Sequence, residues 1–451
     1  MKGLALCLLG AVICGRGLAG DTAYDVAVFG AGPAGLSAAL AAARSGARTV
    51  LVERSASVGG TAVLSGVTNL GLFHAWGRQI VDGPCWEVVT NAVALDTGRL
   101  PDIARPMGRD HNSHCVRVNP YVYAAVAEEA LRKAGVDLQL LSFPVDVSEL
   151  TADGVREIRL QSDAGATTIA VRQIVDATGN AAVAQLAGAA VIREPEASRQ
   201  PGTYFFHLDA KGLAFDAKAL DQAQQAAIAS GELEPTDVFI PMSAFVRQGG
   251  GWGNYVPGAD NTTAKTRADT NWKGRAAMLR VLRFLRRQPG LERVRIVSAE
   301  PETGIRETVR IVGDMTISGE DYIFGRVHPE ALCYSYWMID PHDARTKAAK
   351  LVYLEPERVA TVPLGALLPK GVKGVLVAGR SVSSDHIANS ALRVQGSCMA
   401  MGQVAGTVAA LAAQTKADAR QIDMVRAREA LRKLGAIVPE PAPQAESGGA
   451  K

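Results

Sequence analysis

A short apolar segment that runs directly into closely spaced glycines constrains this chain more than any other feature. The segment YDVAVF at residues 24–29 is followed by GAGPAG at residues 30–35. An alanine-rich stretch at residues 37–44 and a second apolar segment at residues 48–52 come next. This order predicts a strand, a tight glycine turn, a helix and a parallel strand, joined by a right-handed crossover. We therefore expect an α/β fold built around a parallel sheet.

The glycines of this turn suit a dinucleotide site. Gly30 permits the tight turn, Gly32 lets the backbone approach a diphosphate, and Gly35 lets helix and strand pack closely. The helix N-terminus adds free N–H groups and a partial positive charge. Glu53, which follows the second apolar segment, stands where a carboxylate accepts hydrogen bonds from an adenosine ribose and repels the 2′-phosphate of NADP. FAD and NAD share this half of the motif.

Three features further along the chain favour FAD over NAD. Residues 53–60 end in a glycine pair, which allows the chain to pass close to a long cofactor. Residues 173–179 (QIVDATG) predict a strand that ends in Ala-Thr-Gly. Residues 374–413 predict a strand, a Gly-Arg turn and a long helix of small residues. GGGWG at residues 249–253 lacks a preceding strand, so we predict a flexible loop there and no second nucleotide site.

Taken together, these segments resemble the FAD-dependent oxidoreductase family of the glutathione-reductase-like flavoprotein superfamily. The similar stretches include GGTAVLSGVTNLGLFHAWGRQIVDG, VDATGNAAVAQLAGA, TGIRETVRIVGD and AGRSVSSDHIANSALRVQGSCMAMGQVAG. The resemblance implies FAD as the cofactor. It implies a set of binding residues drawn from distant parts of the chain: Gly30, Gly32, Pro33, Ala34, Gly35, Glu53, Arg54, Gly60, Thr61, Val145, Ala177, Gly179, Gly379, Arg380, Gly396 and Gly402.

Within this set the resemblance implies separate tasks. Val145 meets adenine through its backbone, and the Gly379–Arg380 turn leads to the ribityl and flavin end. The helix that begins near Gly396 directs its N-terminus at the flavin, where its dipole stabilises the anionic reduced form. The Asp that is frequent after the second glycine turn is replaced here by Ser-Val-Ser at residues 381–383.

Three side chains are candidates for the chemistry. Substrate oxidation by flavin usually needs a base, and histidine suits that task near neutral pH. His386 is the first candidate, because SSDHIANS lies in the loop that the fold places beside the flavin. His342 is the second, since MIDPHD supplies Asp340 and Asp343 to orient its ring. Arg306 in GIRETVR is suited to hold a carboxylate or to support the reduced flavin.

Composition narrows the class of protein. Apolar residues make up 48% and charged residues 21% of the chain, which is ordinary for a globular protein, and a net charge of +3 does not indicate nucleic-acid binding. The six cysteines lack zinc-type spacing, so we predict no metal site.

We predict an FAD-dependent oxidoreductase, a dehydrogenase or reductase that moves a hydride between a small organic molecule and flavin N5. An oxidase that uses oxygen and a non-catalytic flavin-binding protein are the alternatives, and the electron partner stays open.

The 451 residues predict more than one domain. We expect a Rossmann-type FAD-binding domain, with a parallel sheet, helices and a β-meander, interrupted by an α+β substrate domain. Residues 1–20 predict a signal peptide with no stable membrane span after its removal, and hence a secreted or periplasmic protein, or a cytoplasmic one if the segment is not a signal. The expected division is signal 1–20, FAD-binding 21–190, substrate domain 191–355, FAD-binding 356–435 and disordered tail 436–451.

Overall fold

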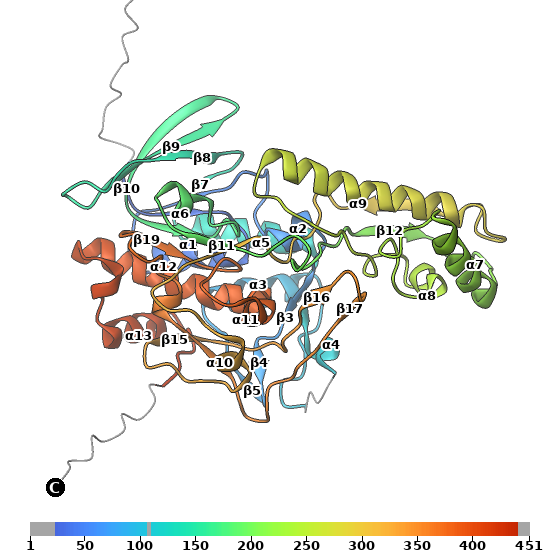
Figure 1. Ribbon diagram of the computed structural model, residues 1–451. Coiled ribbons are helices and arrows are strands. Elements are labelled where there is room, and N and C mark those ends of the chain that lie inside the picture. The colour runs from blue at the N-terminus through green and yellow to red at the C-terminus, as the bar shows by residue number, and fades with distance from the viewer. Residues whose placement is uncertain (1–22, 106–109, 441–451) are drawn as a thin grey trace, which may run out of the picture.

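The computed structural model describes residues 23–105 and 110–440 (Figure 1). The predicted signal peptide, residues 1–20, and the tail from residue 441 lie outside the described residues. The first residues of the predicted tail are part of the folded protein, because Ala436 and Val438 are buried against the main core.

A seven-stranded sheet forms the centre of the molecule. Its strands follow the order β7-β2-β1-β10-β9-β8, and β19 pairs with β10. The parallel part contains β1 (Ala23–Phe29), β2 (Thr49–Val52), β7 (Asp137–Gln139), β19 (Val375–Val377) and the second half of β10 (Gly165–Asp176). Phe29 is in register with both Val52 and Asp176, and Asp176 with Val377, so the carboxyl ends of these strands meet at one edge. Open α/β sheets bind ligands at that edge.

The predicted β-meander extends the same sheet. β8 (Phe143–Val147) pairs antiparallel with β9 (Arg156–Ser162), and β9 pairs antiparallel with the first half of β10. The 12-residue β10 therefore belongs to the meander at its start and to the parallel sheet at its end. The predicted α/β Rossmann-type architecture is confirmed.

Two helices of small residues cover one face of the sheet. α1 (Pro33–Arg44) packs along α12 (Gln395–Thr415). A Cβ on Gly402 would collide with the carbonyl oxygen of Ala34, and one on Gly406 with that of Ala38, so glycine lets the two backbones approach. Among the described residues, α12 alone has the length and apolar composition of a membrane span, and it is buried inside the protein.

Further elements complete this body of the protein. The longest helix before the meander, α5, begins after an Asn119 side-chain cap. The longer elements here are α3 (Pro84–Leu95), α5 (Pro120–Lys133), α11 (His386–Leu392), α13 (Met424–Lys433), β15 (Ala331–Ser335) and β18 (Ala360–Pro363). The short ones are α2 (Thr61–Leu64), α4 (His111–His114), α6 (Ala182–Leu186), α10 (Gly319–Ile323), β3 (Asn69–Gly71), β4 (His74–Ala75), β5 (Arg78–Gln79), β6 (Val116–Arg117), β11 (Val191–Arg193), β14 (Val309–Ile311), β16 (His342–Asp343) and β17 (Ala348–Ala349).

An arm extends to the right of this body in Figure 1 and has a core of its own. It consists of β12 (Phe206–Asp209), β13 (Arg295–Ala299), α7 (Ala217–Ser230), α8 (Met242–Arg247) and the 22-residue α9 (Ala264–Leu285). Its buried apolar residues run from Tyr204 to Ile305, whereas those of residues 317–364 belong to the core around α1 and α12. The predicted substrate domain, 191–355, is therefore divided between two packing units.

The glycine run at residues 249–253 is not the flexible loop that its composition predicts. Four of its glycines have φ between +76° and +136°. Gly251 N–H donates to the Phe206 carbonyl at 2.8 Å, and Leu208 N–H donates to the Gly249 carbonyl at 2.8 Å. The run is therefore fixed along β12, and it leads into Tyr255.

Candidate active site

In the turn between β1 and α1, packing within the protein explains why two of the positions are glycine. Gly30 has φ +90°, and a Cβ there would lie 2.7 Å from the Ala177 carbonyl oxygen. A Cβ on Gly35 would collide with the Gly30 carbonyl oxygen. Gly30 therefore makes the turn and Gly35 lets the helix pack on it, as predicted.

Gly32 differs, because no contact among the described residues requires a glycine there. Its φ is −72°, and a Cβ would have one neighbour within 4 Å, the Gly60 Cα at 3.9 Å. Gly60 has φ +55° and would bring a Cβ within 2.6 Å of the Gly32 Cα, so two loops meet at this point. Gly32 is also the N-cap of α1, and no side chain caps that helix. The position fits a diphosphate approaching the backbone, which is the fit that FAD requires.

Glu53 lies at the carboxyl end of β2 and is buried. Its Oε2 accepts from the Ala31 N–H at 2.7 Å, and its Oε1 accepts from the Ser55 N–H at 2.8 Å. These bonds fix the carboxylate beside the glycine turn, where a ribose hydroxyl would be bound. The neighbouring Arg54 forms an ion pair with Glu302 at 3.1 Å.

A second loop closes this edge, and it carries Arg380, which lies 201 residues after Gly179. Arg380 donates through Nε to the Gly179 carbonyl at 2.7 Å and through Nη1 to the Ile305 carbonyl at 2.9 Å. Its Nη2 donates to Oδ1 of Asn180 at 2.9 Å. Burial, followed by the charge of Arg54, lowers the pKa of Arg380 to about 10. Arg380 thus joins the Ala-Thr-Gly turn to the segment that carries Arg306.

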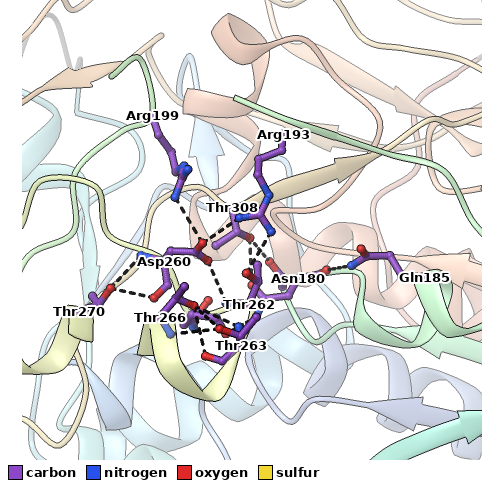
Figure 2. A network of polar contacts seen from close by, with 12 residues as sticks. Asn180, Gln185, Arg193, Arg199, Asp260, Thr262, Thr263, Thr266, Thr270 and Thr308 are labelled. Atoms are coloured by element: carbon purple, nitrogen blue, oxygen red, sulfur yellow. Dashed lines mark hydrogen bonds and ion pairs between the residues drawn. The ribbon is translucent and has the colours of Figure 1, made fainter. Parts of the chain in front are cut away.

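Figure 2 shows the polar network that joins the arm to this turn. Asn180 Nδ2 donates to the Asn261 carbonyl at 3.1 Å, and the Thr308 hydroxyl donates to Asn180 Oδ1 at 2.9 Å. Asp260 forms an ion pair with Arg193 at 2.8 Å and bonds to the Thr262 N–H at 2.9 Å. The cofactor edge and the arm therefore share one polar network.

The structure places most of the predicted cofactor residues together. Gly30, Gly32, Pro33, Gly60, Thr61, Ala177, Gly179 and Arg380 are half-buried, in contrast to the buried strands behind them. A Cβ on Gly379 would touch the Ala34 Cβ at 3.1 Å, and one on Gly396 would lie 2.7 Å from the Leu72 carbonyl oxygen. Val145 lies at the irregular step in the pairing of β8 with β9. Gly402 has a packing task between helices, and its contact with FAD stays a prediction.

Arg380 bonds to the Ile305 carbonyl, and the next residue, Arg306, lies over a tyrosine that a hydrogen-bonded chain joins to a histidine and an aspartate. The Tyr255 hydroxyl lies 2.7 Å from Nδ1 of His342, and Nε2 of His342 lies 3.2 Å from Oδ2 of Asp340. Burial, followed by the charge of Arg306, lowers the pKa of His342 to about 4. Although burial opposes it, the His342 hydrogen bond lowers the pKa of Asp340. At neutral pH the chain therefore consists of a tyrosine, a neutral imidazole and a carboxylate.

Two arginines lie against this chain. The guanidinium carbon of Arg306 lies 5.5 Å from the centre of the Tyr255 ring, and Nη1 of Arg306 donates to the Pro201 carbonyl at 2.7 Å. Nη2 of Arg393 lies 3.6 Å from Oδ2 of Asp340. Burial, followed by the charge of Arg393, lowers the pKa of Arg306 to about 10.

His386, the first catalytic candidate, does not bond directly to His342; it pairs with Glu307, which Gln200 connects to His342. Its Nδ1 lies 3.0 Å from Oε1 of Glu307, and the hydrogen bond with Glu307 raises its pKa. Arg310 forms ion pairs with both Glu307 and Glu194. His386, Glu307 and Glu194 are close enough to hold a metal ion, but the guanidinium of Arg310 already occupies both carboxylates. Its role in catalysis stays a prediction, and the geometry favours His342.

The sequence analysis missed Tyr255 and Gln200. Gln200 accepts through Oε1 from both the His342 N–H and Nη2 of Arg393, at 3.3 Å each, and its own N–H donates to Glu307 at 3.2 Å. No local motif marks either residue. The signal for Tyr255 was the glycine run before it, which composition alone assigns to a flexible loop.

A glycine cradle with a fixed carboxylate at the ribose position, closed by a distant arginine turn, defines an α/β enzyme of the FAD-binding type. The chain belongs to the FAD dependent oxidoreductase family, whose family model matches residues 25–433. It is therefore an FAD-dependent oxidoreductase, and FAD is its cofactor, as predicted.

Several solved structures resemble the chain at low identity. A geranylgeranyl bacteriochlorophyll reductase-like protein (Ta0516) from Thermoplasma acidophilum is 13% identical over 92% of this chain and 84% of its own, with a TM-score of 0.40. The p-nitrophenol 4-monooxygenase PnpA from Pseudomonas putida DLL-E4 is 13% identical over 90% and 82%, with a TM-score of 0.37. The OxyS anhydrotetracycline hydroxylase from Streptomyces rimosus is 16% identical over 44% of this chain, and the match spans only 39% of OxyS, with a TM-score of 0.32. No curated protein sequence matches this chain.

Proposed function

We propose that this enzyme is a dehydrogenase or reductase that moves a hydride between a small organic substrate and N5 of FAD. The observation that carries the proposal is the chain of hydrogen bonds from Tyr255 through His342 to Asp340. A largely buried relay of these three residues, which contacts Arg306 in the segment that Arg380 bonds, is suited to proton transfer at a reacting group.

The residues of the site divide between cofactor and substrate. The glycine cradle, Glu53 and the Arg380 turn would hold FAD, which supplies the acceptor or donor of the hydride when bound. Substrate oxidation breaks a C–H bond, from which the hydride leaves, and an O–H or N–H bond, from which a proton leaves. The relay is required only for the proton.

The geometry gives that proton a path. The Tyr255 hydroxyl accepts it while passing its own proton to Nδ1 of His342, 2.7 Å away. Asp340 accepts a hydrogen bond from Nε2–H of His342 and stabilises the imidazolium that forms. A lowered pKa keeps His342 neutral at pH 7, which leaves its Nδ1 as the acceptor for the Tyr255 proton. Substrate reduction uses the same path in reverse.

Anaerobic mixing of the FAD-loaded protein with alcohols, hydroxy acids and amines tests this proposal. A donor that bleaches the flavin absorbance is expected, and His342→Gln should slow the bleaching by about 10²-fold or more. Arg326→Gln is the control, because Arg326 is exposed and its ion-pair partner is Asp321. Fast reoxidation by oxygen would indicate the oxidase alternative. A flavin that no donor bleaches and no acceptor reoxidises would indicate the non-catalytic one.

We propose two further assignments. The antiparallel meander inserted before the last part of the parallel sheet supports a place in the glutathione-reductase-like superfamily. The composition of residues 1–20 supports export, and the mass of the mature N-terminus tests it.

A further inference from the structure

Arg306 and Arg393, the two arginines beside the relay, have more N–H donors than the surrounding protein offers acceptors. Among the described residues, Arg306 donates only through Nη1, to the Pro201 carbonyl and to the Thr203 hydroxyl at 3.0 Å. Nε of Arg393 is buried and has no hydrogen-bond partner. Both side chains therefore retain N–H groups that the protein does not use.

The charges around the relay do not balance either. Asp340 is the one carboxylate within ion-pair distance of Arg393 in the described part of the chain, and Arg306 has none. Glu307, the next carboxylate along, is already bound to Arg310 and His386. Asp343, whose charge also acts on Tyr255, is already paired with Arg345 at 2.9 Å, so Asp340 is the one carboxylate left to the two guanidinium groups in the described part of the chain. Partly buried positive charge without a counter-ion is costly, and an anion bound there would relieve it.

We propose that Arg306 and Arg393 bind a carboxylate group of the substrate, so that the enzyme acts on small organic acids. This inference rests on the proposed function of the same site. Guanidinium groups recognise carboxylates through paired N–H donors, which is the chemistry left unused here. Such an acid would present its reacting carbon and its O–H or N–H group beside Tyr255.

Binding of an acid would also act on the relay. The groups that face His342 are Asp340, Tyr255, Arg306, Arg393 and the amide oxygen of Gln200. The two arginines disfavour its protonation, with burial the larger cause. A carboxylate between them offsets their charge, so His342 becomes a better base when an acid is bound. Neutral substrates would lack this effect.

Isothermal titration calorimetry of the full-length, FAD-loaded protein tests the inference. The probes are acetate and propionate, with acetamide and propanol as neutral partners of similar size. Saturable binding of the two acids only is expected. Arg306→Gln and Arg393→Gln should each weaken it by about ten-fold or more, since charge-assisted hydrogen bonds are lost. Arg326→Gln should leave it unchanged. Arg306→Lys and Arg393→Lys, with FAD content and circular dichroism, serve where a glutamine variant misfolds.

Two results would overturn the inference. One is equal binding of acids and neutral partners. The other is a change in the flavin midpoint potential of the arginine variants with unchanged affinity for acetate, because the arginines then serve the reduced flavin. Failure of the proposed function can be distinguished from failure of the carboxylate site. If acids bind but no donor bleaches the flavin, the carboxylate site stands and the reaction does not. If propanol bleaches the flavin as fast as a 2-hydroxy acid, the reaction stands and the carboxylate site does not.

Discussion

Replacing Gly32 with alanine should separate cofactor binding from folding. A methyl group at Gly32 finds one atom within 4 Å, at 3.9 Å, among the described residues beyond its chain neighbours, and φ −72° suits any residue. No clash is expected, and the reduced freedom of the unfolded chain opposes the disadvantage of alanine at an N-cap, so the stability of the apoprotein should change by less than about 1 kcal/mol. The matched variant is Gly35→Ala, whose Cβ collides with the Gly30 carbonyl oxygen. It should destabilise the apoprotein by about 3 kcal/mol or more.

FAD should respond in the opposite way. The methyl group of Gly32→Ala would stand where the diphosphate approaches the backbone. Displacing the diphosphate would cost two charge-assisted backbone hydrogen bonds at about 1.5–3 kcal/mol each. FAD affinity should fall by roughly 10²- to 10⁴-fold. Urea unfolding of the apoprotein gives the stability, and quenching of flavin fluorescence gives the affinity. The reasoning is refuted if Gly32→Ala binds FAD like the wild type, or if its apoprotein unfolds as easily as that of Gly35→Ala.

Three further predictions follow from the described geometry. Tyr255→Phe should lower the rate of flavin reduction in stopped-flow by about 10²-fold with FAD affinity unchanged, and an unchanged rate would remove the relay. Gly402→Ala should destabilise the protein by about 2 kcal/mol in urea, because its Cβ meets the Ala34 carbonyl; an unchanged midpoint would contradict that packing. Burial lowers the pKa values of His74 and His342 to about 4, so the unfolded chain binds more protons between pH 6.5 and 4. The contribution of these two histidines to stability should be greatest above pH 6.5 and fall toward pH 4, by up to roughly 3 kcal/mol each; the fall should be smaller in His342→Gln than in the wild type, and an equal fall in both would contradict the His342 shift.

Local patterns predicted the parts of the fold whose causes are local. The strand, glycine turn and helix of residues 23–44 follow from apolar runs and from the conformation that Gly30 alone permits. The α12 helix was predicted from its small residues, but the reason for Gly402 is its contact with Ala34, which is known only when both helices are placed.

The proton relay could not be predicted from the sequence either, because it depends on contacts between distant parts of the chain. Tyr255 and His342 are 87 residues apart and meet because the glycine run is fixed along β12. The sequence favoured His386, whose loop the fold places beside the flavin, over His342, which has an aspartate on either side. The structure separates them by neighbours from elsewhere, Glu307 for one and Tyr255 for the other.

The position of β19 has a consequence for how the protein is made. β10 lacks this neighbour in the parallel sheet until residues 375–377 leave the ribosome, and α1 lacks its cover until α12 follows. About 200 residues separate β10 from β19, which at about 5–20 residues per second is a delay on the order of 10–40 s. During that delay the β10 edge and the small-residue face of α1 are open to wrong pairing, so synthesis rate and chaperone access should govern the yield of this enzyme more than its final stability does.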